Sequence, residues 1–205
     1  MSPSTGAPSD RAWRTSLRER LVAGPTVVFD LEWTSWEGAA ERNWAGPGEF
    51  REIVQIGAVR LAAGSLEETG AFEILIRPVL NPRLSAYFAR LTGIKQADVD
   101  GHGRPFADAM AAFTAFCSDP AGVFFNGADN LVLHANCGLH LMACTIPDHA
   151  FVNLRPLIAA ELGIREPFVS SDLPRFLGHS SVGPAHQGLA DARAVALALR
   201  ALAAV

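Results

Sequence analysis

Two acidic residues end an apolar segment near the start of the chain. The segment TVVFDLEW (residues 26–33) carries Asp30 and Glu32 two positions apart, and residues so spaced in a β-strand share one face. Because like charges repel, and because burying them unpaired costs free energy, a cation should neutralise the pair. Carboxylate oxygens suit Mg²⁺ or Mn²⁺. The alternative is that one or both carboxylates point into solvent at the end of the strand.

A histidine and an aspartate lie close together in the C-terminal segment PAHQGLADARAVALAL (residues 184–199). On a single helix they would diverge by about 140°, because five residues rotate by about 500°. Pro184 and Gly188 favour a loop at His186 and a helix that starts near Leu189, which puts Asp191 in a first turn, where the helix dipole favours an acid. The two side chains can then converge. The alternatives are an ordinary first-turn acid and an ordinary loop histidine.

Asp129 follows the apolar segment GVFFN (residues 122–126) and opens a segment with a helical pattern. Such an aspartate can simply be an N-cap or a first-turn residue. Together with Asp30, Glu32 and Asp191, however, it would supply four carboxylates at the ends of separate elements. Four carboxylates can hold two divalent ions about 4 Å apart, and a histidine such as His186 beside them can take a proton from water.

Apolar periodicity and turn residues predict the elements that must position these side chains. We expect strands at 26–33, 52–61, 71–79, 122–126 and 150–154, and helices at 10–22, within 81–94, and at 105–117, 129–141, 154–163, 171–177 and about 189–203. The Gly64-Ser65 turn indicates an antiparallel hairpin of the second and third strands. The last two strands should join in parallel through helical crossovers. The predicted fold class is α/β, with a mixed five-stranded sheet flanked by helices.

The length of 205 residues fits one globular domain with short additions. Residues 1–9 are rich in Pro, Ser and Gly and are predicted to be a disordered tail. Residues 10–23 are predicted to form an N-terminal helix, and residues 24–205 a single domain. The helix carries Arg11, Arg14, Arg18 and Arg20, which form either a solvated face or a patch that contacts a nucleic-acid backbone.

Composition restricts the classes of partner and compartment. The net charge is −4, so bulk electrostatics do not predict a nucleic-acid partner, and any such contact must be local and bridged by metal cations. We find no apolar run long enough to span a bilayer and no secretion signal in the polar N-terminus, so we expect no membrane association. Cys117, Cys137 and Cys144 are few and odd in number, which predicts reduced core thiols in a cytoplasmic protein.

Several separated segments together resemble a known family. They are VVFDLEW with Thr34, then EIVQIGAV, NPRLSAYFARLTGIKQADVD, Asp129 and HQGLAD. In this order they resemble the DEDDh 3′-to-5′ exonucleases of the DnaQ-like, RNase H-related superfamily, over about residues 25–200. The Leu-Thr-Gly-Ile run at 91–94 after Asn81-Pro82, and the spacing from Asp129 to Cys137, are similar to the ERI-1/KapD-like subgroup. The resemblance implies an RNase H-like fold and makes residues 24–205 one exonuclease domain.

The resemblance also implies an activity and the roles of the acidic residues. The metal ligands would be Asp30, Glu32, Asp129 and Asp191, and the general base would be His186. The cofactors would be two divalent metal ions, Mg²⁺ or Mn²⁺. Members of the family remove nucleoside 5′-monophosphates one at a time, so the implied partner is RNA or single-stranded DNA with a free 3′ end.

A further set of residues would hold the terminal nucleotide. Those that match the family's positions around this nucleotide, or that could stack on a base, are Leu31, Trp33, Thr34, Leu91, Ile94 and Phe125. Leu91 and Ile94 match the segment that packs on the terminal base, and a ring such as Trp33 or Phe125 can hold bases without reading them. The alternative for the apolar members of this set is packing in the core.

Three other functions are compatible with these residues. On the same scaffold the protein could be an oligoribonuclease or a proofreading-type DNase, although the interval from Asn126 to Asp129 is one residue tighter than in proofreading subunits. It could be a non-catalytic or regulatory nucleic-acid-binding protein that kept the fold. Without the resemblance, a small α/β domain could use a carboxylate metal site on small phosphoesters. The sequence leaves open the choice between RNA and DNA, a homodimer, and a targeting partner.

Overall fold

A mixed five-stranded sheet forms the centre of the protein, with the strand order β3-β2-β1-β4-β5. The strands are β1 (Thr26–Trp33), β2 (Ile53–Leu61), β3 (Glu68–Leu75), β4 (Gly122–Phe125) and β5 (Phe151–Asn153). The β1–β2 and β2–β3 pairs are antiparallel, and the β1–β4 and β4–β5 pairs are parallel. The computed structural model describes the backbone of residues 10–204 and the side chains of residues 13–204, so the tail predicted at 1–9 lies outside the described residues. The predicted α/β class, hairpin and parallel crossovers are confirmed.

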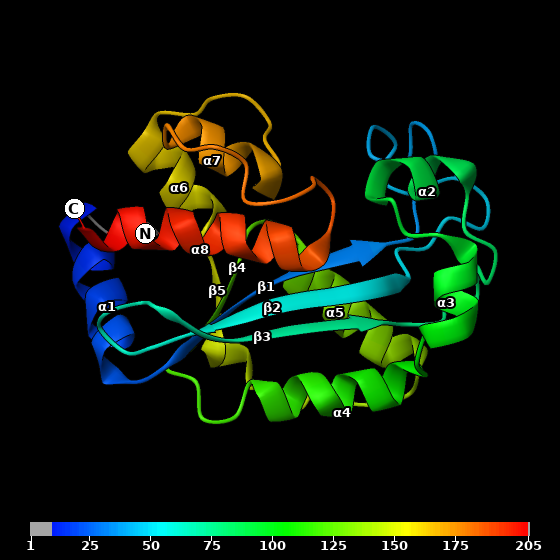
Figure 1. Cartoon of the computed structure of the whole chain (residues 1–205), viewed down its shortest axis with the longest axis horizontal. Coiled ribbons are helices and arrows are strands. Elements are labelled where there is room, and N and C mark those ends of the chain that lie inside the picture. Colours follow the sequence, from blue (N-terminus) through cyan, green and yellow to red (C-terminus); the bar gives the residue numbers. More distant parts are fainter. Residues whose placement is uncertain (1–9, 205) are drawn as a thin grey trace, which may run out of the picture.

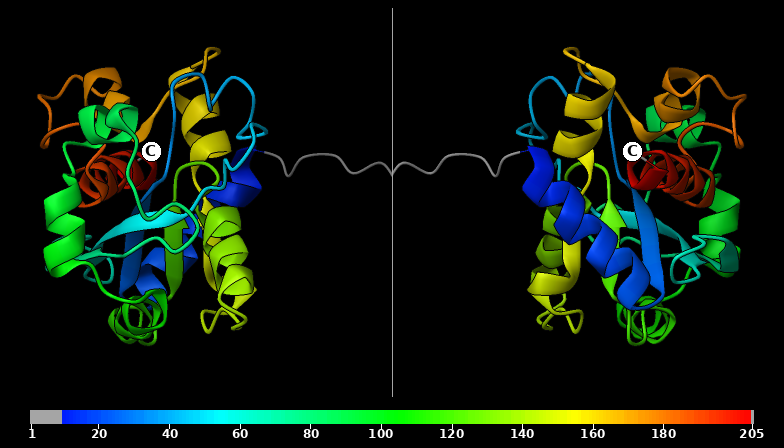
Figure 2. Two further views of the ribbon diagram at one scale, coloured as in Figure 1. Left: turned by 90° about the vertical axis from the view of Figure 1, so that its right-hand side faces the viewer. Right: turned by 90° about the vertical axis from the view of Figure 1, so that its left-hand side faces the viewer.

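Helices cover both faces of this sheet, as Figure 1 and Figure 2 show. They are α1 (Asp10–Ala23), α2 (Ala86–Thr92), α3 (Gln96–His102), α4 (Phe106–Phe116), α5 (Asp129–Leu139), α6 (Arg155–Leu162), α7 (Leu173–Phe176) and α8 (Gly188–Ala204). Two 3₁₀ turns, η1 (Asp148–Ala150) and η2 (Ser170–Asp172), precede β5 and α7. The helices α4 and α5 lie on one face of the sheet, and α8 lies on the other with α1, α6 and α7.

β1 contributes to the apolar core on both of its faces. Phe29 packs with Phe113 of α4 and with Phe125 of β4 in one cluster, whereas Val28 belongs to the cluster under α8. A strand buried on both faces has a nearly continuous apolar sequence, as β1 does. Because side chains alternate along a strand, the residues two and four positions after Val28 also lie on the α8 face.

The third strand and one helix differ from the prediction. β3 spans Glu68–Leu75 rather than 71–79, because its ladder with β2 already begins at the Leu61–Glu68 pair. After β3 the backbone N–H of Ile76 still donates to the carbonyl of Val54 in β2 at 2.7 Å, whereas that of Arg77 donates to the carbonyl of Arg104 at 3.0 Å. No apolar period in the sequence predicts α3, since this helix of seven residues buries one side chain, Val99.

The carboxylate of Glu52 holds the chain that follows β3. Glu52 is buried, and its side chain accepts the backbone N–H groups of Val79, Leu80 and Asn81. Three N–H donors to one carboxylate satisfy a buried charge without a cationic side chain. This contact anchors the loop that leads to α2.

The N-terminus of α8 lies against β2 at a contact between two glycines. A Cβ atom at Gly57 would lie 2.0 Å from the carbonyl carbon of Gly188, a distance at which atoms overlap. The backbone N–H of Gly188 also donates to the side-chain Oε1 of Gln55 at 2.8 Å. In the β1–β2 ladder, Gly57 pairs with Asp30 and Gln55 pairs with Glu32. The contact therefore brings the first turn of α8 over the two acids of β1.

Two arginines of α1 make contacts within the protein. Arg14 forms a salt bridge with Glu161 of α6, and the side chain of Arg20 donates to the carbonyl oxygens of Ala121 and His149. Figure 1 shows α1 at the end of the sheet opposite to the C-terminal end of β1. These two side chains thus stabilise the packing of α1, far from the acids of β1.

The cysteine side chains are free thiols in the described part of the chain. Cys117 and Cys137 are buried, and Cys144 is partly buried. Among the helices of residues 10–204, none combines the length and the apolar character that crossing a membrane requires.

Replacing Gly57 with alanine is expected to destabilise the fold, because the added methyl group overlaps the backbone of α8. Overpacking of this kind costs about 1–3 kcal/mol or more. Gly70→Ala is a matched control, since Gly70 also lies in a strand, but a Cβ atom there would lie 3.6 Å from the nearest atom, in ordinary van der Waals contact. Urea unfolding followed by circular dichroism measures both free energies of unfolding. Equal stability of the two variants would contradict the close contact.

Candidate active site

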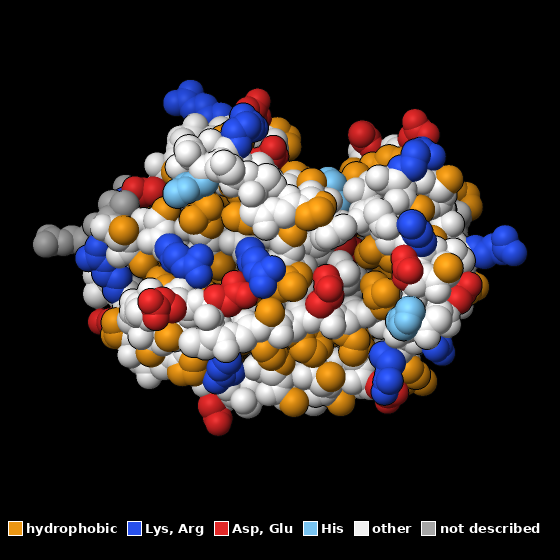
Figure 3. All heavy atoms as spheres, in the orientation of Figure 1, with side chains coloured by type: hydrophobic (Ala, Val, Ile, Leu, Met, Phe, Trp, Pro, Cys, Tyr) orange, Lys and Arg blue, Asp and Glu red, His pale blue; other side chains and the backbone are white. Residues whose placement is uncertain are grey.

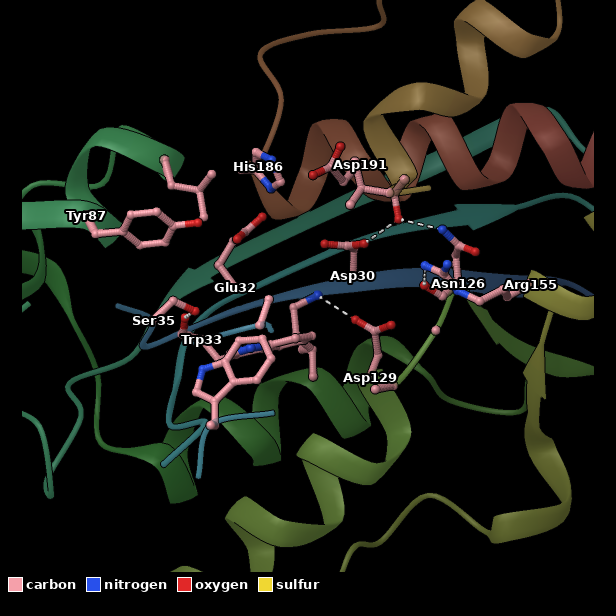
Figure 4. Close-up of a pocket in the computed structure, with 18 of the residues that line it drawn as sticks. Asp30, Glu32, Trp33, Ser35, Tyr87, Asn126, Asp129, Arg155, His186 and Asp191 are labelled. Carbon is pink, nitrogen blue, oxygen red and sulfur yellow. Dashed lines mark hydrogen bonds between the residues drawn. The ribbon is translucent and has the colours of Figure 1, made fainter. Parts of the chain in front are cut away.

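Four acidic side chains and one histidine meet at the C-terminal end of β1 (Figure 4). Asp30 and Glu32 extend from β1, Asp129 is the first residue of α5, and Asp191 lies in the first turn of α8. All four acids are buried, with exposed fractions of 8%, 7%, 3% and 4% in that order. His186 lies in the turn before α8 and adopts the left-handed backbone conformation, with φ of 56°. That conformation is uncommon for a residue other than glycine and is typical of functional sites.

Hydrogen bonds from uncharged groups orient two of the acids. Asp129 Oδ1 accepts the backbone N–H of Leu31 at 3.1 Å, which ties α5 to β1. Ser170 Oγ donates to Asp30 Oδ1 at 2.9 Å and accepts a hydrogen bond from Asn126 Nδ2 at 3.1 Å. Each hydrogen bond to a carboxylate favours its ionised form. Asp30 and Asp129 are therefore held in position without a cationic side chain.

Burial raises the pKa of each of the four acids above its ordinary value. The pKa of Asp129 and that of Asp191 rise to about 7, and burial is the largest cause in both. The pKa of Asp30 rises well above its usual range through burial and then through the charges of Asp129, Glu32 and Asp191. Burial, followed by the charges of Asp191 and Asp129, likewise raises the pKa of Glu32. Without a cation, full ionisation of this site is disfavoured near neutral pH.

The imidazole of His186 lies beside two of these acids. One ring nitrogen of His186 and one carboxylate oxygen each from Glu32 and Asp191 lie within 4.8 Å of one another. Burial lowers the pKa of His186, and the negative charge of Asp172 partly offsets this effect. A lowered pKa keeps the imidazole neutral near pH 7. A neutral imidazole at this position can bind a metal ion or accept a proton from a water molecule.

The donor groups of this corner fit a divalent cation. Among the described residues, no lysine or arginine forms a salt bridge with any of the four acids. A bound cation would stabilise the ionised carboxylates that burial otherwise disfavours, and carboxylate oxygens suit Mg²⁺ and Mn²⁺. Glu32, His186 and Asp191 form the group close enough to share one ion, and Asp30 lies between that group and Asp129.

A cavity of about 620 Å³ opens over these residues. Figure 3 shows the surface hollowed between the lobe of α6 and α7 and the lobe of α2. Figure 4 shows Trp33, Ser35 and Tyr87 on one side of the acids and Asn126 and Arg155 on the other. The cavity has the size and the mixture of apolar walls and convergent polar groups that ligand sites have.

Three of the six residues predicted around a terminal nucleotide line the cavity, namely Leu31, Trp33 and Leu91. The other three are buried in the core and do not line it, namely Thr34, Ile94 and Phe125. Thr34 Oγ1 donates to the carbonyl of Phe50 at 2.6 Å, Ile94 belongs to a small apolar cluster with Phe88, and Phe125 packs against Phe29. These three side chains support the fold around the cavity from behind.

The cavity also has lining residues that no sequence pattern predicted. They are Ser35, Trp36, Ala40, Trp44, Tyr87, Asn126, Gly127, Ala128, Arg155, Val169 and Ser170. The tryptophans of the polar loop after β1 were a usable signal, because Trp36 and Trp44 are unusual in such a segment. Ser170 and Arg155 lie in segments without a motif, and the tertiary fold brings them to the acids.

Residues 27–199 match the protein family described as Exonuclease (RNase_T). One similar protein is the 3′-5′ exonuclease Snipper of Drosophila melanogaster, which is 38% identical over 100 residues, or 46% of this chain and 33% of Snipper. Another is ERI1 exoribonuclease 3 of Mus musculus, 23% identical over 164 residues, or 75% of this chain and 48% of the mouse protein. The chain thus aligns with less than half the length of either relative.

Solved structures share the fold. The nuclease domain of 3′hExo, a DEDDh family member bound to rAMP, has a TM-score of 0.70 at 22% sequence identity, and the match covers 87% of this chain and 92% of that one. Exonuclease I of E. coli in complex with a dT13 oligonucleotide has a TM-score of 0.65 at 14% identity, over 85% of this chain and 40% of that one. At these identities the likeness establishes an RNase H-like fold.

The free energy of unfolding of the metal-free protein is expected to fall as the pH rises from about 4 to about 7. Over this range the folded protein keeps protons on Asp129 and Asp191, whose pKa is about 7, whereas the unfolded chain has lost them. Asp129→Asn removes one buried charge and keeps an acceptor for the N–H of Leu31. It should therefore exceed the wild type in stability at about pH 8 by a few kcal/mol.

Urea unfolding in the presence of a chelator, repeated at several pH values, measures this dependence. Asp108→Asn is the control, because Asp108 is an exposed aspartate of α4 and its loss should leave the slope near neutral pH unchanged. A wild-type stability that stays constant or rises from about pH 5 to about pH 8 would contradict the raised pKa values.

Proposed function

Because the chain belongs to the exonuclease family (RNase_T), as the resemblance to the DEDDh exonucleases predicted, we propose that it is a 3′-to-5′ exonuclease. It hydrolyses the terminal phosphodiester of RNA or single-stranded DNA and releases nucleoside 5′-monophosphates. The observation that supports this most strongly is the meeting of four buried acids and a neutral imidazole at the floor of one cavity. A relative named as an exoribonuclease and a neighbour solved with a DNA oligonucleotide support both kinds of strand as candidates.

Two divalent ions, Mg²⁺ or Mn²⁺, are the proposed cofactors. The carboxylates of Asp30, Glu32 and Asp191 would hold one ion, and Asp30 with Asp129 would hold the other. Bound ions of this kind lower the pKa of water and stabilise the charge that develops on phosphate and leaving oxygens. Support for this assignment comes from the absence of salt bridges to these acids among the described residues and from the carboxylate oxygens of Glu32 and Asp191, which lie within 4.8 Å of one another.

His186 is the proposed general base. Its imidazole lies beside Glu32 and Asp191, and burial lowers its pKa, so at neutral pH it can accept the proton of an attacking water molecule. Its left-handed backbone conformation supports a functional role, since such strain persists where the surrounding structure enforces it. Ser170, which donates to Asp30, is a positioning residue for the carboxylate that both ions would share.

The walls of the cavity suit the nucleoside at the end of a strand. Leu31, Trp33 and Leu91 are lining residues, as are Trp36 and Tyr87, and together they give the cavity an apolar and aromatic surface. Aromatic rings stack on any base, so this surface suits the terminal nucleoside without reading its identity. The same surface gives no reason to distinguish RNA from DNA, since the 2′-OH is recognised by polar groups.

A non-catalytic nucleic-acid-binding protein on the same fold is the second candidate. The raised pKa values and the complete set of acids favour the enzyme, because a binding protein gains nothing from burying four carboxylates. Measurable binding of a single strand without turnover in Mg²⁺ or Mn²⁺ would favour the second candidate.

His186→Ala is expected to lower the rate of mononucleotide release by about 10²–10⁴-fold, the usual contribution of a general base. The assay follows 5′-mononucleotides released from a single strand in Mg²⁺ or Mn²⁺. His179→Ala is the matched control, because His179 is an exposed histidine of the segment between α7 and α8. A His186→Ala protein that folds and keeps the wild-type rate would remove this residue from the mechanism.

Addition of Mg²⁺ or Mn²⁺ is expected to raise the midpoint of thermal unfolding by several degrees, and more at about pH 8 than at about pH 5. The reason is that the ligands must be deprotonated to bind the ion, and that an ion bound to the folded state stabilises it. Asp191→Asn should reduce this shift, since it replaces a proposed ligand, whereas Asp108→Asn should leave it unchanged. Equal shifts in all three proteins would exclude the proposed metal site.

A further inference from the structure

Arg155 lines the same cavity, and the reaction proposed above gives it no role. It is the first residue of α6 and is half-buried. Its guanidinium lies over the ring of Phe168, with the Cζ atom 4.5 Å from the ring centroid, and its Nη1 donates to the carbonyl of Phe168 at 2.8 Å. These contacts hold the side chain in one place at the wall of the cavity.

Several N–H donors of the Arg155 guanidinium make no hydrogen bond within the described residues. Of its five N–H groups, one donates to Phe168, and a second lies at the long distance of 3.5 Å from the carbonyl of Asn126. Asp129 attracts it electrostatically, but no salt bridge forms to Arg155 within the described residues. A Cβ atom at Gly127 would lie 3.4 Å from both Nε and Nη2, so the glycine leaves room beside these donors. The free donors can therefore meet an anion.

Arg155 is also the one lysine or arginine among the described residues that line the cavity. The protein carries a net charge of −4, and the cavity holds four acids, so a cation here is not part of a general basic surface. A half-buried guanidinium that forms no salt bridge among the described residues is costly unless acceptors satisfy its donors. An anionic group of the substrate can supply acceptors for the donors that Arg155 presents at the cavity wall.

The position of Arg155 relative to His186 indicates which part of the substrate it meets. In an in-line displacement, the attacking water and the leaving oxygen lie on opposite sides of the phosphorus. His186, the proposed base, lies on one side of Asp30, whereas Asp129 and Arg155 lie on the other (Figure 4). In a 3′-to-5′ exonuclease, the leaving oxygen belongs to the strand that the enzyme retains. The retained strand therefore passes Arg155.

We propose that Arg155 binds the phosphate on the 5′ side of the first retained nucleotide. This assignment rests on the proposed exonuclease function. An arginine fork can donate two parallel hydrogen bonds to phosphate oxygens, and such a contact positions a strand without reading its bases. The enzyme then prefers a substrate that carries this second phosphate over a dinucleoside monophosphate, whose single phosphate is the one that is cleaved.

The test compares pApA with ApA, in ribose and deoxyribose forms, because the two substrates differ only in the phosphate at issue. The wild type is expected to show a higher kcat/KM for pApA, mainly through a lower KM. Arg155→Gln keeps a polar side chain with N–H donors but has no charge. In this variant the ratio of kcat/KM for pApA over ApA should fall by about 10- to 100-fold, the loss of one charge-assisted hydrogen-bonded contact.

Two further variants separate binding from support of the fold. Arg200→Gln is the matched control, since Arg200 of α8 also donates to a backbone carbonyl, that of Leu66, but does not line the cavity, and its ratio should equal that of the wild type. Arg155→Lys keeps the charge and should retain part of the preference for pApA over ApA. If Arg155→Gln does not fold, the ratio measured for Arg155→Lys still tests the proposal. An equal loss of rate on both substrates, with the ratio unchanged, would show a structural role and overturn the proposal. A wild-type enzyme that cleaves ApA and pApA equally, or that degrades a longer single strand but cleaves neither, would also overturn it, whereas one that releases no mononucleotide from a longer strand refutes the exonuclease function itself.

Discussion

Repulsion among four buried carboxylates is the constraint that the rest of this structure has to satisfy. Burial already disfavours the charged form of each acid. In addition, each acid either raises the pKa of a neighbouring acid through its charge or has its own pKa raised by the charge of a neighbouring acid. A site of this kind reduces stability, so it persists only where surrounding contacts over-determine it. The hydroxyl of Ser170 and the backbone N–H of Leu31 fix two of the acids, and the contact of Gly57 with Gly188 fixes the helix that brings a third. Hydrogen bonds from neutral donors and close packing therefore hold these acids in place, as cationic side chains do in an ordinary buried ion pair. The acids remain available to a metal ion.

Much of the fold and the order of the acids could be predicted because the signals are local. A strand buried on both faces has an apolar run, and the alternation of side chains alone puts Asp30 and Glu32 on one face. The convergence of His186 with Asp191 follows from the point at which α8 begins, and Pro184 and Gly188 mark that point in the sequence. The end of β3 was not predictable in this way. It depends on acceptors from other segments, since the carbonyl of Arg104 accepts the N–H of Arg77 and the carboxylate of Glu52 accepts the N–H of Val79.

The walls of the cavity were less predictable than its floor, because which side of an element faces a cavity depends on tertiary packing. Phe125 ends β4 next to the site in sequence, but its ring points to the α5 side of the sheet, where Phe29 and Phe151 surround it. Conversely, Ser170 belongs to a short 3₁₀ turn with no motif, and it reaches Asp30 across 140 residues of sequence. A hydrogen bond between residues so far apart in the sequence produces no periodic pattern from which it could be predicted. Sequence patterns therefore located the acids, and the structure was needed to identify the side chains that orient them.

The cavity has an aromatic side and a cationic side. This arrangement bears on how an acidic protein can bind and process a polyanion. With a net charge of −4 and acidic and basic side chains interspersed on the face seen in Figure 3, long-range attraction contributes little, so affinity must come from a few local contacts. Under the proposed function these are stacking of the terminal nucleoside, bound cations at the scissile phosphate, and one guanidinium at the retained strand. Each of these contacts is repeated at every nucleotide and reads no base. A strand that has lost its terminal nucleotide can therefore advance by one phosphate and find the same contacts again.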